Sequence, residues 1–116
     1  MIPWVTGNDA KVPELPGVYE LLVKQEDGKY LRRYIGEGDS LRERFQRHLS
    51  PSEPNACIKE RLAKYTCAFD YAVINDRDDR LDAERALYEK YRSQARCNHT
   101  PPPGSGRPHD VEIVEE

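Results

Sequence analysis

Two short segments near the N-terminus have the composition of β-strands. Residues 18–24 and 30–35 are rich in β-branched, aromatic and aliphatic side chains, which favour the pleated, half-buried surface of a sheet. Between them stands Glu26-Asp27-Gly28, and Asp-Gly is a strong short-range hairpin signal. The pattern therefore predicts an antiparallel pair of strands.

The turn decides whether two tyrosines of this hairpin meet. A four-residue loop over 25–28 would place Tyr19 directly opposite Tyr34, and a two-residue loop at 27–28 would make them diagonal neighbours on one face. Both registers bring the two phenols together. A slip of one residue would separate them, because successive side chains of a strand point to opposite faces.

A helix is predicted to follow the hairpin. Asp39 or Ser40 can cap its N-terminus, and the pattern extends to about residue 49. Arg44 and His48 are four residues apart, so they lie on one edge of this helix at the boundary between core and solvent. An arginine there can keep its stem dry and direct its guanidinium toward a phosphate. The buried stripe consists of Leu41, Phe45 and Leu49.

Three further elements are predicted after a loop at residues 50–55, which contains two prolines. A short helix follows the loop and carries Ile58, Leu62 and Tyr65. A third strand at 67–74 alternates large apolar residues with smaller or polar ones. Asp78 or Asp79 then caps a helix that extends to about Ser93. The chain is thus expected to be an α+β domain with a three-stranded antiparallel sheet and about three helices.

An acidic residue interrupts the apolar face of the last helix. At 100° per residue, Glu84 falls near the middle of the arc formed by Leu81, Leu87, Tyr88 and Tyr91. A dry, unpaired carboxylate would cost several kcal/mol, so Glu84 must meet a cation, a metal ion or a water-filled cleft. It could instead pair with Arg44, or lie at the rim of a rotated helix.

Taken together, these residues resemble the GIY-YIG nuclease family. The resemblance rests on Pro16-Gly17-Val18-Tyr19 and Arg33-Tyr34-Ile35-Gly36, followed in order by Arg44, His48 and Glu84, and it covers residues 16–98. It implies hydrolysis of phosphodiester bonds in DNA with one bound divalent metal ion, Mg²⁺ or Mn²⁺. The active site would lie over the first two strands.

The resemblance also implies a role for each matching position. Tyr19 and Tyr34 match the two motif tyrosines, one of which helps to activate or orient the attacking water. Arg44 matches the arginine that stabilises charge on the scissile phosphate, and His48 matches a position that contacts the phosphate or supports proton transfer. Glu84 matches the metal-binding glutamate, and Asn98 an asparagine found past the last helix. Substrate contacts are expected from Gly36, Arg33, Arg47 and Asn98.

Charge is the main argument against a nucleic-acid enzyme, because the net charge of −3 gives no general attraction to a polyanion. Four of the 21 acidic residues lie in the last seven, so residues 1–107 carry 18 basic and 17 acidic side chains. Glu37, directly after Tyr34-Ile35-Gly36, is a departure from the family pattern, since several members carry lysine there. An acid at this position would repel phosphate unless it points away or reaches the metal.

Composition defines the remaining organisation. A chain of 116 residues is long enough for one small domain, which we divide into a lead-in at 1–15, a nuclease-like domain at 16–99 and a proline-glycine linker with an acidic tail, expected to be disordered, at 100–116. No apolar run long enough for a membrane span and no signal-peptide pattern are found. The three cysteines lack CxxC spacing and indicate a reducing interior, hence a cytoplasmic protein, with Cys67 buried.

Two hypotheses of different classes follow. The first is a metal-dependent DNA endonuclease that consists of the catalytic module alone and is either recruited by a targeting protein or acts on a structure such as a branch, flap or lesion. The second is a nonenzymatic nucleic-acid- or protein-binding module that keeps the fold, or a nuclease that is active only with a partner. The intact Tyr19, Tyr34, Arg44 and Glu84 favour the first, and the near-neutral charge favours the second. The oligomeric state is left open.

Overall fold

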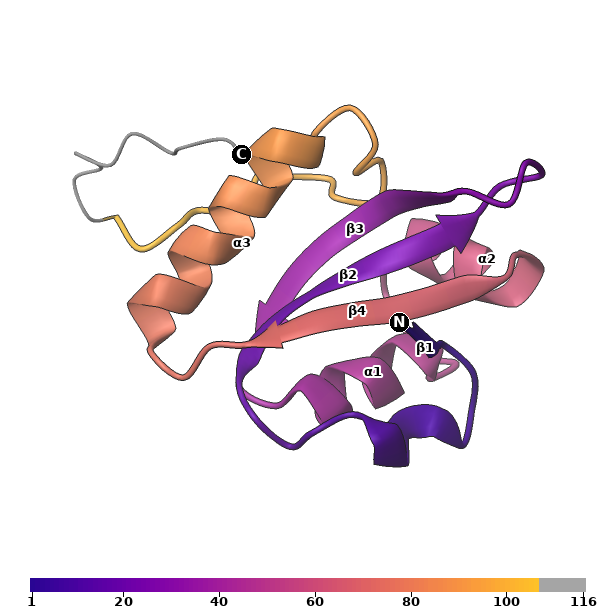
Figure 1. The fold of residues 1–116 in the computed structure, drawn as a ribbon, viewed down its shortest axis with the longest axis horizontal. Coiled ribbons are helices and arrows are strands. Elements are labelled where there is room, and N and C mark those ends of the chain that lie inside the picture. The colour runs from indigo at the N-terminus through magenta and orange to yellow at the C-terminus, as the bar shows by residue number, and fades with distance from the viewer. Residues whose placement is uncertain (107–116) are drawn as a thin grey trace.

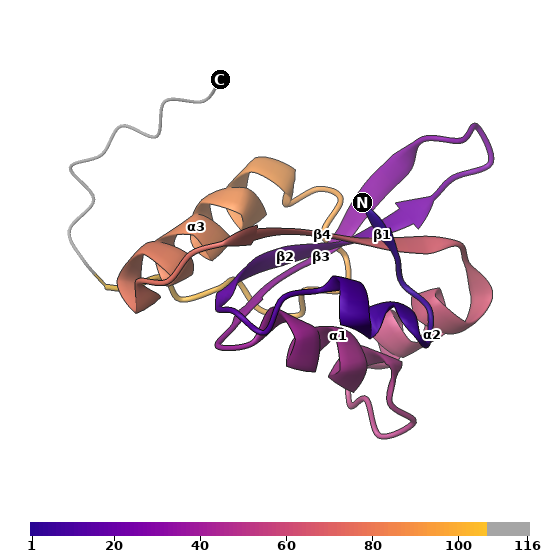
Figure 2. The same cartoon turned by 60° about the horizontal axis from the view of Figure 1, so that its bottom comes forward.

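The computed structural model describes residues 1–106, which form one antiparallel sheet with helices on both faces. α3 lies on one face, and α1 and α2 lie on the other (Figures 1 and 2). The strands are β1 (Ile2–Pro3), β2 (Gly17–Lys24), β3 (Tyr30–Gly38) and β4 (Cys67–Val73); the helices are a 3₁₀ turn (Asn8–Lys11), α1 (Leu41–Leu49), α2 (Ala56–Lys64) and α3 (Arg77–Tyr91). This is the predicted α+β architecture, with one strand more than expected.

The additional strand comes from the N-terminal segment. The strand order is β1-β4-β2-β3, and β1 pairs with β4 through Ile2 opposite Phe69 and Pro3 opposite Ala68. Next to this strand, the Trp4 side chain is 2% exposed and donates from Nε1 to the Phe45 carbonyl oxygen at 3.1 Å. Residues 1–15 are therefore part of the domain core and not a separate lead-in.

The hairpin turn differs from both predicted loops. Lys24 pairs with Tyr30, so the loop has five residues, and Gly28 within it has a φ of 85°. This conformation is unfavourable for residues with a Cβ. The observed pairing is shifted by one residue from either prediction, and by itself it would place the two tyrosines on opposite faces.

A β-bulge corrects the register farther along the hairpin. The pairing shifts between Leu22, which lies opposite Arg32, and Leu21, which lies opposite Tyr34. Arg33 is thus the extra residue. Beyond it, Tyr19 lies opposite Gly36, so Tyr19 and Tyr34 become diagonal neighbours on the same face. The expected proximity is correct, but the bulge and not the turn produces it.

The segment after α3 covers the outer edge of β3. The Cys97 amide donates to the Arg33 carbonyl at 2.8 Å, and the Arg32 amide donates to Gln94 Oε1 at 3.1 Å. The Asn98 side chain forms two hydrogen bonds of 2.9 Å with the amide and the carbonyl of Ile35. These bonds pair outward backbone amides and carbonyls of β3 with residues 94–98, and they hold the bulge at Arg33 in place.

A disulfide links the same segment to α2. Cys57 and Cys97 are joined, with a Cα–Cα distance of 5.3 Å, and the Asn55 side chain donates to the Cys97 carbonyl at 2.9 Å. The cysteine spacing, which indicates a reducing interior, does not predict this bond, because the fold brings together residues 40 apart in the sequence. Cys67 is free and buried, as predicted, and burial raises the pKa of its thiol to about 11.

The helix caps largely follow the predicted pattern. The Ser40 side chain caps α1 by accepting from the Glu43 amide, and Leu41 and Phe45 form its buried face. α3 begins earlier than expected, because Asp76 and not Asp78 or Asp79 is its cap, accepting from the Asp79 amide at 2.8 Å. None of the helices in residues 1–106 combines the length and the apolar composition that a bilayer crossing requires.

Residues 100–106, expected to belong to a disordered linker, lie along α3 instead. Pro102 is buried and its carbonyl accepts from Arg85 Nη1 at 3.1 Å, and the Ser105 amide donates to Asp82 Oδ1 at 3.0 Å. These bonds explain the order of a segment whose composition is typical of linkers. The acidic end, residues 107–116, lies outside the described residues.

Reduction of the Cys57–Cys97 disulfide is expected to destabilise the domain. Because the bond closes a loop of 40 residues, its loss should lower the free energy of unfolding by about 2–4 kcal/mol. Urea denaturation with and without a phosphine reductant measures the difference. The double variant Cys57→Ser/Cys97→Ser is the control, and its stability should not respond to reductant; an unchanged wild-type midpoint would contradict the prediction.

Candidate active site

The two motif tyrosines pack against each other over a glycine. Their ring centroids are 6.1 Å apart. A Cβ built on Gly36 would lie 2.5 Å from Tyr19 Cζ and 2.8 Å from Tyr34 Cε2, so no side chain fits there without displacing both rings. Gly36 therefore makes room for the two phenols, which is a structural task, whereas the sequence suggested a contact with substrate.

A chain of hydrogen bonds extends from Tyr19 into the loop after α1. The Tyr19 hydroxyl lies 2.7 Å from His48 Nε2, and His48 Nδ1 lies 2.9 Å from Glu53 Oε2. The second Glu53 oxygen accepts from the Asn55 amide at 3.1 Å. The side chains of His48 and Glu53 are only 10% and 6% exposed, so this phenol–imidazole–carboxylate chain is shielded from water.

Burial determines the protonation states in this chain. It raises the pKa of Tyr19 well above its ordinary value, with a further rise from Tyr34 and an opposing effect of Arg44. It also lowers the pKa of His48, although Glu53 opposes that change. A neutral imidazole whose Nδ1–H donates to Glu53 leaves Nε2 as the acceptor for the Tyr19 hydroxyl. The geometry thus aligns a path for a proton from phenol to imidazole, while both pKa shifts keep the proton on Tyr19 at rest.

A cavity of about 230 Å³ opens beside these residues, and Tyr34, Arg44, Arg47 and His48 are part of its lining. The Arg44 guanidinium forms no ion pair with any acid in residues 1–106. Its stem lies over Gly38, where an added Cβ would be 2.7 Å from Arg44 Cγ. An unpaired guanidinium at the wall of a cavity is suited to an anionic ligand.

Glu84 belongs to α3, which packs against the edge strand β3. It lies close enough to Arg44 and Tyr34 to interact with both electrostatically. It is half-buried, and the described part of the chain offers its carboxylate no hydrogen bond or ion pair. Burial raises its pKa to about 7, Glu37 adds to the rise and Arg44 opposes it. The carboxylate of Glu84 also raises the pKa of Tyr34, after the effect of burial. Glu84 is therefore an acid that no residue in 1–106 neutralises by a hydrogen bond or ion pair.

Glu37, the departure noted in the sequence, is held by a buried arginine. Arg80 of α3 is 3% exposed and donates from Nε to Glu37 at 2.7 Å and from Nη2 to Asp39 at 2.8 Å. Arg80 thus compensates the charge of Glu37 close to Glu84. The repulsion of phosphate that Glu37 would cause is reduced by this pair.

Of the other three expected substrate-binding residues, Asn98 and Arg33 are not part of the cavity lining, whereas Arg47 is. The amide of Asn98 is occupied by both polar groups of Ile35, so its task is to hold β3. Arg33 is the bulge residue; its Nη1 donates to the Gln94 carbonyl at 3.4 Å, and its buried Nε has no partner in the described structure. Arg47 does line the cavity and stays 3.8 Å from Glu43, an exposed pair.

Sequence reasoning missed two residues of the site. Glu53 stands in a loop that contains two prolines, and its local sequence indicates only a loop; the available signal is an acid five residues after the helix-terminal His48. Arg80 lies in the first turns of α3 among several charged residues, so nothing local distinguished it as buried. Both are identified only by contacts between distant elements.

Within residues 1–106, no group of three or more potential metal ligands of the His, Cys, Asp and Glu types comes together. A cation at Glu84 would therefore keep most of its water ligands, as Mg²⁺ does when one or two carboxylates bind it. The half-buried, unpartnered carboxylate fits this requirement.

Comparison with solved structures identifies the fold. The magnesium-bound GIY-YIG N-terminal endonuclease domain of UvrC from Thermotoga maritima matches over 81% of this chain and 99% of that domain, with a TM-score of 0.59 and 22% identity. A tyrosine-to-phenylalanine mutant of the same domain, bound to its catalytic divalent cation, matches over 83% and 100%, with a TM-score of 0.60 and 22% identity. Comparisons of the sequence with protein-family models and with curated proteins found no match. This chain has the fold of the GIY-YIG endonuclease domain.

Proposed function

We propose that this protein is a divalent-metal-dependent endonuclease that hydrolyses phosphodiester bonds in DNA. The observation that carries the proposal is a pair of unsatisfied charged groups, the Arg44 guanidinium and the Glu84 carboxylate. They stand beside the hydrogen-bonded chain of Tyr19, His48 and Glu53. An unpaired cation and an unpaired acid are costly to retain near a protein core, and a metal ion with a phosphate would neutralise both.

Glu84 would hold the metal ion, Mg²⁺ or Mn²⁺. The bound ion would polarise the phosphate and stabilise the leaving oxygen. Two features of this chain prepare the position: burial leaves the carboxylate poorly hydrated, and Arg80 compensates the charge of the adjacent Glu37.

The phenols and the imidazole would handle the proton of the attacking water. Tyr34 lines the cavity, whereas Tyr19 is only 2% exposed, so Tyr34 orients the water and Tyr19 connects it to the interior. The proton then passes to His48 Nε2, the nearest basic nitrogen, and Glu53 stabilises the imidazolium that forms. This path removes the need for a free tyrosinate, which burial disfavours at both positions.

Arg44 would stabilise the charge that develops on the scissile phosphate. Its guanidinium is preorganised by the packing of its stem over Gly38 and carries no competing carboxylate from residues 1–106. Arg47, at the more exposed wall of the cavity, would contact a neighbouring phosphate of the same strand.

A nonenzymatic binding module is the second candidate, favoured by the net charge of −3. A DNA backbone would gain little from the overall field of such a chain. The first experiment is therefore cleavage of labelled single-stranded, duplex, flap and branched DNA, and of matched RNA, with Mg²⁺ or Mn²⁺. No cleavage of any substrate by the folded protein would favour the binding module or a partner-dependent nuclease.

Replacement of Glu84 by glutamine should abolish metal-dependent cleavage and leave the fold intact. The amide keeps the shape of the carboxylate but loses its charge, so Mg²⁺ should no longer raise the melting temperature of the variant. In the wild type this stabilisation should be stronger at pH 8 than at pH 6, because protons compete with the metal below the pKa of about 7. Full cleavage by Glu84→Gln would refute the metal site.

Loss of the Arg44 guanidinium should slow cleavage and leave the fold intact. Arg44→Ala is expected to lower kcat by about 10²-fold or more, by analogy with the removal of one preorganised transition-state donor. Arg92→Ala, which removes an exposed arginine whose contact with Glu89 is 4.0 Å, is the matched control and should cleave at the wild-type rate. Equal rates for the two variants would exclude the proposed role.

Glu53→Gln tests the proton path. The glutamine can still hydrogen-bond His48 but cannot stabilise an imidazolium, so kcat should fall about tenfold or more at saturating metal. Because Glu53 opposes the lowered pKa of His48, its removal should lower that pKa further and shift the acidic limb of the pH–rate profile to lower pH. Glu60→Gln, on the exposed side of α2, is the control; an unchanged profile in Glu53→Gln would contradict the path.

A further inference from the structure

One half of β4 has an outer edge that no described strand covers. Pairing of β1 with β4 ends at Phe69, whereas β4 continues to Val73. The Cys67 carbonyl accepts from the Trp4 amide on the outer side, and the Ile74 amide donates to the Pro16 carbonyl on the inner side. Since inward and outward groups alternate along a strand, the amides and carbonyls of Tyr71 and Val73 point outward.

The free edge lacks the usual protection against pairing. Natural sheets often shield open edges with lysine, proline or a bulge, but the residues here are Asp70-Tyr71-Ala72-Val73. Tyr71 and Val73 are large apolar side chains that are 37% and 41% exposed. Within residues 1–106, the outward amide of Tyr71 has only the neighbouring Asp70 Oδ1 as an acceptor, at 3.2 Å. The edge is thus available for an additional strand.

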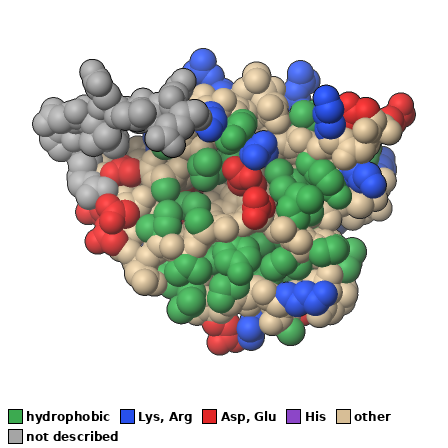
Figure 3. Space-filling model, in the orientation of Figure 1, with side chains coloured by type: hydrophobic (Ala, Val, Ile, Leu, Met, Phe, Trp, Pro, Cys, Tyr) green, Lys and Arg blue, Asp and Glu red, His purple; other side chains and the backbone are tan. Residues whose placement is uncertain are grey.

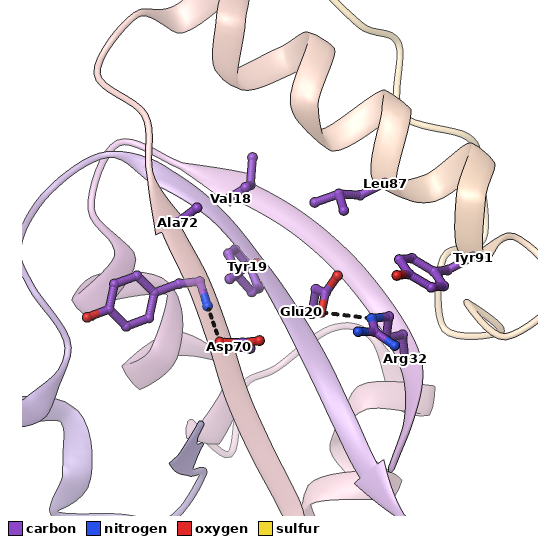
Figure 4. Close-up of a pocket in the computed structure, with 9 residues that line it drawn as sticks. Val18, Tyr19, Glu20, Arg32, Asp70, Ala72, Leu87 and Tyr91 are labelled. Carbon is purple, nitrogen blue, oxygen red and sulfur yellow. Dashed lines mark hydrogen bonds and ion pairs between the residues drawn. The ribbon is translucent and has the colours of Figure 1, made fainter. Parts of the chain in front are cut away.

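A hollow lies beside this edge, on the sheet face that carries α3. It has a volume of about 270 Å³ and lies between β4 and α3, with Ala72 and Leu87 among its apolar walls. Acidic side chains stand at the centre of this face, surrounded by hydrophobic ones (Figure 3). Figure 4 shows that Glu20 and Asp70 come from neighbouring strands, with Arg32 and Tyr91 toward α3.

The charges in the hollow are unevenly distributed. Glu20 and Asp70 are direct cross-strand partners, and like charges in such positions repel each other. Arg32 pairs with Glu20 at 3.1 Å and stacks on Tyr91 at 4.1 Å, so its cation is engaged at the α3 end. Lys90 is also at that end, 5.4 Å from the Tyr91 ring. Asp70, at the β4 end, has no cationic partner among residues 1–106.

We propose that the Tyr71–Val73 edge binds an extended segment of a partner protein as an added strand, with an arginine or lysine of that segment directed to Asp70 in the adjacent hollow. Main-chain hydrogen bonds would supply affinity, and the basic side chain would supply specificity. The apolar walls would contact the stem of that side chain. This surface lies on the opposite side of β2 from the edge strand β3, so it leaves the cavity at Arg44 accessible.

Charge favours a basic partner segment over two other possible occupants of this edge, which are the chain's own residues 107–116 and a second copy of the chain. Residues 107–116 carry one arginine, Arg107, against four acidic residues, Asp110, Glu112, Glu115 and Glu116, so Asp70 would repel the net charge of this segment. A second copy joined edge to edge would bring two Asp70 side chains near one interface. A basic segment alone relieves the repulsion between Glu20 and Asp70.

The test uses the full ¹⁵N-labelled chain and a seven-residue peptide of alternating valine and threonine with a central arginine. Binding should shift the Tyr71 and Val73 amide resonances and slow their hydrogen exchange. A matched peptide with citrulline in place of arginine should bind roughly threefold to fivefold more weakly, as expected for a partly exposed ion pair. Equal affinities for the two peptides, or shifts confined to Tyr34 and His48, would overturn the proposal.

Two variants measure separately what the backbone edge of β4 and the charge of Asp70 contribute to peptide binding. Val73→Pro removes an outward amide that bonds no described residue, so the fold should persist while peptide binding is lost. Asp70→Asn should bind both peptides equally, at the affinity of the citrulline peptide. Concentration-dependent dimers, or tighter binding after deletion of residues 107–116, would instead identify a second copy or the chain's own tail as the occupant, and would refute a partner segment.

Peptide binding at the β4 edge does not depend on the proposed nuclease activity. Asp70 and Val73 contribute nothing to the cavity at Arg44, so both variants should cleave DNA as the wild type does. Peptide binding without any nuclease activity would leave the docking edge in place and remove only the proposed function, while cleavage without peptide binding would do the reverse.

Discussion

The pairing register of β2 and β3 is the constraint on which the rest of the site depends. Side chains alternate between the faces of a sheet, so a displacement of one residue would turn Tyr34 away from Tyr19. The turn alone produces that displacement, and the bulge at Arg33 cancels it. The bulge is in turn fixed by hydrogen bonds from residues 94–98, which the disulfide to α2 holds against β3. The candidate site on the hairpin thus relies on a segment more than 60 residues later in the sequence.

The site combines polar side chains that hydrogen-bond one another with charged side chains that have no hydrogen-bond or ion-pair partner among residues 1–106. Tyr19, His48 and Glu53 bond one another in a dry environment, where satisfied polar chains are rigid. Arg44 and Glu84 have no hydrogen-bond or ion-pair partner among residues 1–106, and such groups reduce stability unless a ligand engages them. The buried Arg80 limits this cost by pairing with Glu37 and Asp39. The balance is typical of a site in which the protein prepares charges for a bound ion and its substrate.

The two edges of the sheet have opposite characters. The β3 edge is closed by residues 94–98 and supports the site, whereas the β4 edge beyond Phe69 pairs with no strand of residues 1–106 and is flanked by an acidic hollow. A chain with a net charge of −3 attracts DNA only weakly. Recruitment by a basic partner bound at the β4 edge would bring the protein to its substrate even though its own electrostatic field is weak.

The sequence by itself determined the elements and most of the chemistry. The hairpin, the capped helix with Arg44 and His48, and the misplaced acid Glu84 follow from local periodicity, because strand and helix patterns depend on neighbouring residues. Tertiary structure alone decided the bulge at Arg33, the integration of residues 1–15, the Cys57–Cys97 bond, and the tasks of Asn98, Glu53 and Arg80. Each of these depends on contacts between residues far apart in the chain, and such contacts are set by how whole elements pack, which no local pattern encodes.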